Sequence, residues 1–155
     1  MDKKLIGVLV IVALILCGVG AYTFMNMNTA NFGKSTVTIP DGFKVKQTND
    51  TNSSANSTVL SDGKTTYYIN ENYNKSIDDI FNDYKNKHSE DTVVEKQTNV
   101  GNITVESITL KHDNKTVHTN YYYQKEGKIY HIYNTGKNNK TAFNKIVTST
   151  KKSVI

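Results

Sequence analysis

Four histidines are the side chains of this chain best suited to metal binding or acid–base chemistry: His88, His112, His118 and His131. A zinc site needs three or four ligands that converge on one point. His118 and His131 share one face of a predicted hairpin but lie four residues, or roughly 13 Å, apart along it. Because His88 lies at a predicted helix end and His112 at a turn, we expect surface histidines and no metal site.

Carboxylates and nucleophiles give no firmer signal of catalysis. Asp78, Asp79 and Asp83 lie close together on a predicted helix, and paired carboxylates can do acid–base work. Asp78 and Asp79 are better explained as first-turn residues, where the helix dipole favours negative charge. No serine lies in a G-x-S-x-G or S-x-x-K frame, and no glycine-rich phosphate loop occurs. The sequence therefore predicts no catalytic residue and no cofactor.

The charge pattern argues against nucleic acid as a partner. All 19 basic residues are lysine, and they are scattered among acidic residues. Nucleic-acid binders concentrate positive charge and use arginine for bidentate contacts. The formal net charge of +5 leaves only a salt-screened attraction to acidic polymers or anionic headgroups.

Two helices are predicted to position these side chains. The first begins at the N-cap Ser76, ends near His88, and has an apolar stripe at the helical spacing. The second begins at Asn139 or Thr141. Their apolar positions are Ile77, Ile80, Phe81 and Tyr84 in the first, and Ala142, Phe143, Ile146 and Val147 in the second.

Alternating apolar and polar residues predict strands along most of the remaining chain. These cover residues 35–39, 43–47, 58–60, 65–70, 92–97, 103–112, 115–125 and 128–134. Pro40-Asp41-Gly42 is a turn, and the last three strands form a meander. The predicted fold class is α+β, with two helices packed on one antiparallel sheet.

The register of the meander follows from its turns. A two-residue turn at Glu126-Gly127 places Tyr123 opposite Tyr130. A preceding turn centred on Asn114-Lys115 places Ile108 opposite Tyr121. One face then forms a core, which a slip of one residue would destroy. Its predicted members are Ile108, Leu110, Val117, Tyr121, Tyr123, Tyr130 and Ile132.

The other face of the meander is the candidate binding face. It consists of His118, Asn120, Tyr122, Gln124, His131 and Tyr133. Tyrosine supplies rigid contact area and a hydroxyl, so such a face suits glycan or protein contact. The alternative is that a helix covers this face, or that it is ordinary solvated sheet, in which case it is not a site.

The N-terminal segment Leu5–Met25 has 21 residues without a charge, enough to span a bilayer core of about 30 Å. Lys3 and Lys4 precede it, which predicts a cytoplasmic N-terminus. We therefore expect a single-pass protein of the cell membrane, with a cytoplasmic tip (1–4), an anchor (5–25), a flexible tether (26–34) and an extracytoplasmic domain (35–155). A signal peptide cut after Ala21, or a lipid on Cys17, are the alternatives.

Three glycosylation sequons cluster in the polar loop 48–57, at Asn49, Asn52 and Asn56. Such sequons accept N-glycans only in an exported chain whose cell has the machinery. We take the three as candidate glycosylation sites because a loop of this composition is expected to be exposed.

Several motifs between Ser35 and Ile155 resemble a known group of proteins. The "IPDGFKV" opening, the helix with paired aspartates and the "YYYQKEGKIYHI" hairpin are similar to small membrane-anchored exported proteins of methanogenic archaea. That resemblance implies a PsbP-like α/β/α sandwich and a non-catalytic accessory or binding role. It transfers no functional residue, because the shared motifs are structural.

The sequence thus favours an anchored extracytoplasmic binding module. Its expected partner is an envelope polymer, such as a glycan, or a neighbouring membrane protein. The alternative is a structural or assembly accessory of a transporter or secretion complex, and an enzyme is the least favoured class.

Overall fold

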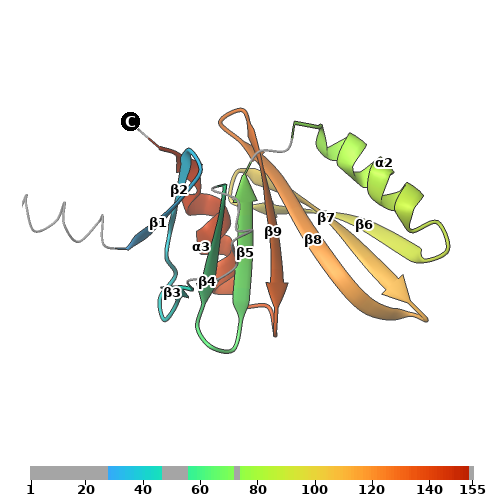
Figure 1. The fold of residues 1–155 in the computed structure, drawn as a ribbon, viewed down its shortest axis with the longest axis horizontal. Helices are drawn as coiled ribbons and strands as arrows, with labels where there is room; N and C mark the ends of the chain where they lie inside the picture. The colour runs from blue at the N-terminus through green and yellow to red at the C-terminus, as the bar shows by residue number, and fades with distance from the viewer. Residues whose placement is uncertain (1–27, 47–55, 72–73, 154–155) are drawn as a thin grey trace, which may run out of the picture.

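A seven-stranded antiparallel sheet forms the centre of the fold (Figure 1) in a computed structural model that describes residues 28–46, 56–71 and 74–153. Its strands are ordered β3-β4-β5-β9-β8-β7-β6. Their bounds are β3 Lys44–Val45, β4 Ser57–Ser61, β5 Thr66–Glu71, β6 Thr92–Val100, β7 Ile103–His112, β8 Lys115–Lys125 and β9 Lys128–Thr135. A smaller sheet contains β1 Thr29–Phe32, β2 Ser35–Thr38 and β10 Lys151–Lys152.

The two helices pack on opposite faces of the large sheet. Helix α3, Lys140–Ser149, covers one face, where the Phe143 ring contacts Tyr67 and Tyr121 at centroid distances of 6.3 and 4.8 Å. Helix α2, Ile77–Lys87, covers the other face, where Phe81 meets Tyr122 edge-on at 5.6 Å. We call these the α3 face and the α2 face. The expected α+β architecture with two packed helices is confirmed.

The helices are also displaced along the sheet. In Figure 1 α2 lies near β6 and β7, whereas α3 lies nearer β4 and β5. The larger core lies under α3 and includes Tyr67, Tyr123 and Ile132. The smaller cluster under α2 joins Phe81 to Ile108 and Tyr122. Each helix therefore leaves part of its own face to solvent.

Both predicted helix starts are confirmed by their N-caps. The Ser76 hydroxyl accepts a hydrogen bond from the Asp79 N–H at 3.1 Å, and the Asn139 side-chain oxygen accepts one from the Ala142 N–H at 3.1 Å. Each satisfies a backbone donor that has no partner within the helix. All four apolar residues predicted for the second helix are buried.

The predicted register is correct for one hairpin of the meander and wrong for the other. Tyr123 pairs with Tyr130 as expected. Ile108 pairs with Asn120 rather than Tyr121, because β7 and β8 are joined at Asp113 and Asn114, both with positive φ, and carry a bulge beyond Leu110. The turn lies one residue earlier than predicted, which shifts the pairing by two, and the extra residue of the bulge shifts it back by one.

This shift moves three residues out of the predicted core face. Ile108 and Leu110 pair with Asn120 and His118, so they lie on the α2 face. Ile108 is buried there against α2, and Val117 is 60% exposed. The other four predicted members, Tyr121, Tyr123, Tyr130 and Ile132, belong to the core under α3.

The stretch 26–34, expected to be a flexible tether, contains a strand in its described part. Strand β1 pairs with β2, and Ala30 and Phe32 are buried. The Phe32 ring meets Tyr130 edge-on at 6.0 Å. The tether prediction is therefore wrong for these residues: although most of the segment is polar, its two apolar side chains, Ala30 and Phe32, pack into the core. The folded domain begins before Ser35.

A buried carboxylate joins the small sheet to the large one. Glu71 accepts hydrogen bonds from the Lys34 N–H at 2.8 Å and from the Ser35 hydroxyl, and it pairs with Lys128 at 3.2 Å. Burial acts to raise the pKa of Glu71, but the three donors outweigh it and lower this pKa below its ordinary value. Gly33 lies so close that an added Cβ would stand 2.0 Å from Glu71 Oε1.

Within residues 28–46, 56–71 and 74–153, no helix is both long and apolar enough to cross a membrane. The predicted cytoplasmic tip and the anchor Leu5–Met25 lie outside those residues, as do the sequons at Asn49 and Asn52.

Candidate functional site

The candidate site is the part of the α2 face that α2 leaves uncovered, on β5, β9 and β8. We call it the platform and define it by six residues that share this face across paired strands. They are Tyr68 and Asn70 on β5, His131 and Tyr133 on β9, and His118 and Asn120 on β8. Side chains of one strand alternate between faces, so the register of the three strands brings these six together.

Two tyrosines stack at the outer side of the platform. Tyr68 and Tyr133 are directly opposite each other on β5 and β9, and their rings are parallel within 4° at a centroid distance of 4.6 Å. Both side chains are half-buried. Each ring covers one face of the other, and because both side chains are only half-buried, part of each ring remains open to a partner.

Two histidines meet at a single amide oxygen beside this stack. Asn120 Oδ1 lies 2.6 Å from His131 Nε2 and 3.2 Å from His118 Nε2. The Asn70 side-chain nitrogen lies 3.2 Å from His131 Nδ1. With Asn70 donating to Nδ1, His131 carries its proton on Nε2 and donates it to Asn120. Both histidine rings also lie 5.5 Å from the Tyr133 ring.

The His131 imidazole is held neutral at physiological pH. Burial, and to a smaller extent the electrostatic effect of nearby His118, lowers the pKa of His131 to about 4. The Tyr122 ring stacks on the His131 ring at 4.7 Å. The six platform residues include no carboxylate or ammonium group, and the buried histidine among them, His131, is uncharged at pH 7.

The six residues of the predicted binding face do share one face, but they differ in access. His118 and Gln124 are exposed and Tyr133 is half-buried. Asn120, Tyr122 and His131 are buried, Tyr122 beneath Phe81 of α2. The expected alternative of a covering helix thus holds for the Tyr122 end, whereas the Tyr133 end is open.

Sequence reasoning missed Tyr68 and Asn70, because it did not place β5 beside β9. These strands are separated along the chain by α2, β6, β7 and β8, and spacing along the chain does not report such a pairing. The alternation in Thr66–Glu71 could have shown that Tyr68 and Asn70 share a face. It could not have shown which strand they meet.

The histidines are arranged differently from the expectation of four separate surface residues. His131 lies opposite Tyr122, four residues from His118 along β8, as predicted, but both side chains reach the oxygen of Asn120, which lies between them. His112 and His88 both face Asp91, with Nδ1–oxygen distances of 3.0 and 3.7 Å. Among the described residues, no group of three or more histidine, cysteine or acidic side chains is placed to hold a metal ion.

The aspartates of α2 have structural roles. Asp78 and Asp79 lie in the first turn of the helix. Asp83 forms an exposed ion pair with Lys75, which lowers the pKa of Asp83. Solvent-exposed pairs of this kind contribute little to stability.

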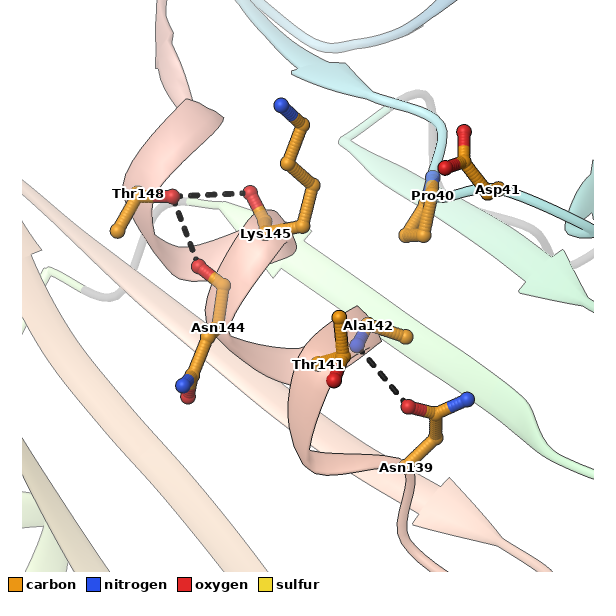
Figure 2. Close-up of a pocket in the computed structure, with 8 residues that line it drawn as sticks. All are labelled: Pro40, Asp41, Asn139, Thr141, Ala142, Asn144, Lys145 and Thr148. Atoms are coloured by element: carbon orange, nitrogen blue, oxygen red, sulfur yellow. Dashed lines mark hydrogen bonds between the residues drawn. The ribbon is translucent and has the colours of Figure 1, made fainter.

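A pocket of about 360 Å³ lies between α3 and the turn that follows β2 (Figure 2). Pro40 and Asp41 form one side, and Lys145 and Thr148 lie on the other. The Thr148 hydroxyl donates to carbonyl oxygens of α3 itself, at 2.8 Å to Asn144. The Thr148 hydroxyl and the Asn139 cap thus form hydrogen bonds within α3, and the residues that line the pocket do not form a cluster of reactive groups.

Of the three predicted glycosylation sites, Asn56 lies among the described residues. It is half-buried, its carbonyl accepts a hydrogen bond from the Glu71 N–H at 3.0 Å, and the sequon residue Thr58 is buried in β4. Glycosylation at these sites stays a prediction.

No family model and no curated protein sequence matches the chain. Among solved structures, it is similar to the solution structure of cyanobacterial PsbP, CyanoP, from Synechocystis sp. PCC 6803, with 10% identity and a TM-score of 0.44. The match covers 77% of this chain and 86% of that one. At this level we transfer no residue, ligand or function from CyanoP.

Proposed function

We propose that the chain is a single-pass membrane protein anchored through Leu5–Met25, with its N-terminus in the cytoplasm. Its domain lies outside the membrane and binds a neutral glycan polymer of the cell envelope through the platform. The observation that supports binding is the Tyr68–Tyr133 stack, a half-buried aromatic pair on a part of the sheet that no described helix covers.

The chemistry of the platform favours a neutral, polyhydroxylated ligand. Sugars present apolar C–H groups together with many hydroxyls, and tyrosine offers an apolar ring that carries a hydroxyl. Asn70 and His118 add amide and imidazole groups at the margin of the stack. With no carboxylate or ammonium group in the platform, an ionic ligand finds no charged partner there.

The platform is also rigid. Tyr68 and Tyr133 lie on paired interior strands, and each holds the other's ring in place. Immobilising a free side chain on binding costs about 0.5–1.5 kcal/mol, and a preformed stack avoids most of that cost. Tyrosine has few rotatable bonds, which suits it to such surfaces.

Co-sedimentation of the full chain in detergent with the insoluble polysaccharide of the envelope tests the binding. We expect retention at both low and high salt, because the platform contains no carboxylate or ammonium group. Tyr68→Ala and Tyr133→Ala should weaken retention about tenfold. Tyr84→Ala, a half-buried tyrosine on α2, is the matched control and should retain binding.

Two results would overturn the glycan assignment. One is equal retention of the platform variants and the control. The other is crosslinking in native membranes that joins the platform to one membrane protein and not to polymer, which would favour a protein partner.

The anchor has its own test. The mass of the protein isolated from membranes should correspond to a chain that retains Leu5–Met25. A mature N-terminus after Ala21, or a mass increase from lipid at Cys17, would contradict an uncleaved anchor. Protease added to intact cells should cleave the domain if it lies outside.

A further inference from the structure

We propose that His118 and His131, with the side-chain oxygen of Asn120, form a binding site for a divalent transition-metal ion, copper in preference to zinc. The observation that supports this proposal is that His118 Nε2 and His131 Nε2 both lie within hydrogen-bond distance of Asn120 Oδ1, at 3.2 and 2.6 Å. This site does not depend on the proposed glycan binding.

The geometry brings two imidazole nitrogens to one side-chain oxygen. His118 and Asn120 are two residues apart on β8 and so share a face, and His131 lies on the neighbouring strand opposite Tyr122. A metal ion sits about 2.0–2.1 Å from each ligating nitrogen, so ligand atoms around it are near neighbours of one another. The place that Asn120 Oδ1 now occupies is within 2.6 and 3.2 Å of the two nitrogens, so a metal ion bound to both lies near it. Rotation of the Asn120 side chain makes room for the ion and lets the oxygen bind it from the side.

Metal binding requires a proton to move on each imidazole that now donates through Nε2. In His131 the proton passes from Nε2 to Nδ1, so the ring stays neutral and the Nε2 lone pair faces the metal. Asn70 then turns its amide, so that its oxygen accepts from Nδ1–H in place of its nitrogen donating. An acceptor behind a metal-bound histidine is the usual supporting arrangement.

The donor set selects the class of metal. Calcium and magnesium prefer sets made wholly of oxygen, and two imidazoles disfavour them. Imidazole suits zinc, copper and nickel, and copper(II) binds such sets most tightly among these ions. His118 is exposed, so the metal can enter from solvent and water can complete its coordination. The site is therefore an exchangeable one rather than a closed structural zinc site.

Copper(II) titration of the metal-free full chain, followed by calorimetry and electron paramagnetic resonance, tests the proposal. We expect one tight copper(II) ion per chain, with hyperfine coupling to two imidazole nitrogens. His118→Gln should lower the affinity at least tenfold without changing the unfolding temperature, because His118 is exposed. The matched control is His112→Gln, which removes an exposed histidine that contacts the Asp91 carboxylate and lies outside the proposed site.

Variants of Asn70 separate a metal site from a purely structural cluster. Asn70→Asp provides a stronger acceptor for His131 Nδ1–H and should raise copper affinity, whereas Asn70→Leu should lower it. A structural role alone would not give opposite signs. The proposal is overturned if copper is not bound, if His112→Gln abolishes binding while His118→Gln does not, or if both Asn70 variants leave the affinity unchanged.

Discussion

At the scale of single residues, the most consequential side chain is a buried carboxylate, Glu71, in a strand whose other core-facing residues are apolar. Glu71 occupies a core-facing position of β5, in line with Tyr67 and Ile69, and its side chain is 1% exposed. A buried charge is costly unless it is paired and hydrogen-bonded. Lys34, Ser35 and Lys128 meet that requirement, and two of them flank the start of β2.

Replacing Glu71 with glutamine should lower the free energy of unfolding at pH 7 by about 2–4 kcal/mol, because Lys128 and the Ser35 hydroxyl lose an ionic partner. Chemical denaturation measures this change. Glu95→Gln is the matched control: its pair with Lys85 is nearly half exposed on both sides, and the change should cost less than about 1 kcal/mol.

The pH dependence of that difference has a definite sign. The pKa of Glu71 is lowered in the folded state, so its stabilisation is complete above the unfolded pKa of about 4.3 and is lost as pH falls through the folded pKa. Wild type and Glu71→Gln should therefore converge in stability in acid. A gap that stayed constant down to pH 2 would contradict an ionised Glu71.

At the scale of elements, β1 shows how a short strand escapes sequence reasoning. Its residues include asparagine and threonine, and only Ala30 and Phe32 are buried. Two apolar residues in four do not stand out from a polar tether. They become part of the core because β2 and Tyr130 lie beside them.

Phe32→Ala should lower the free energy of unfolding by about 3–5 kcal/mol, because it removes a nearly fully buried ring that contacts Tyr130. Denaturation in urea gives the value. Val117→Ala, at a side chain 60% exposed, should change stability by less than about 0.5 kcal/mol. Similar effects of the two substitutions would mean that β1 does not pack as described.

The elements with strong local signals were predictable. Helix α2 has an N-cap and an apolar stripe, and the β8–β9 hairpin has a two-residue turn that fixes its register. The β7–β8 pairing was not predictable in full, because the bulge at Val117 has no signal in the local sequence. For the same reason the platform was found only in part: its β8 and β9 residues follow from alternation, whereas Tyr68 and Asn70 depend on the non-local pairing of β5 with β9.

At the scale of the whole molecule, the displacement of the two helices along the sheet means that central strands are more deeply buried than the edge strand β6. Strands β8 and β9 have hydrogen-bonded neighbours on both sides and buried residues on both faces, including Tyr122, Tyr123, Tyr130 and His131. Strand β6 has one neighbour, and most of its residues are exposed.

Amide hydrogen exchange of the folded chain should follow this gradient. The slowest amides should lie in the middle of β8 and β9, where opening requires loss of both cores, and those of β6 and α2 should exchange faster. Mass spectrometry of peptic fragments resolves these segments. Equal protection of β6 and β9 would indicate that the sheet opens only as one unit.

The bulge in β8 also bears on how the chain could change in length. Thr116 pairs with Lys111 and His118 with Leu110, so Val117 is the residue that the ladder skips. Deleting Val117 would leave the pairs on both sides intact. Deleting any single residue from Thr119 to Lys125 would instead turn part of the strand over and exchange its two faces. Position 117 is therefore where this hairpin can tolerate a gain or loss of one residue while its histidines and tyrosines stay on their present sides.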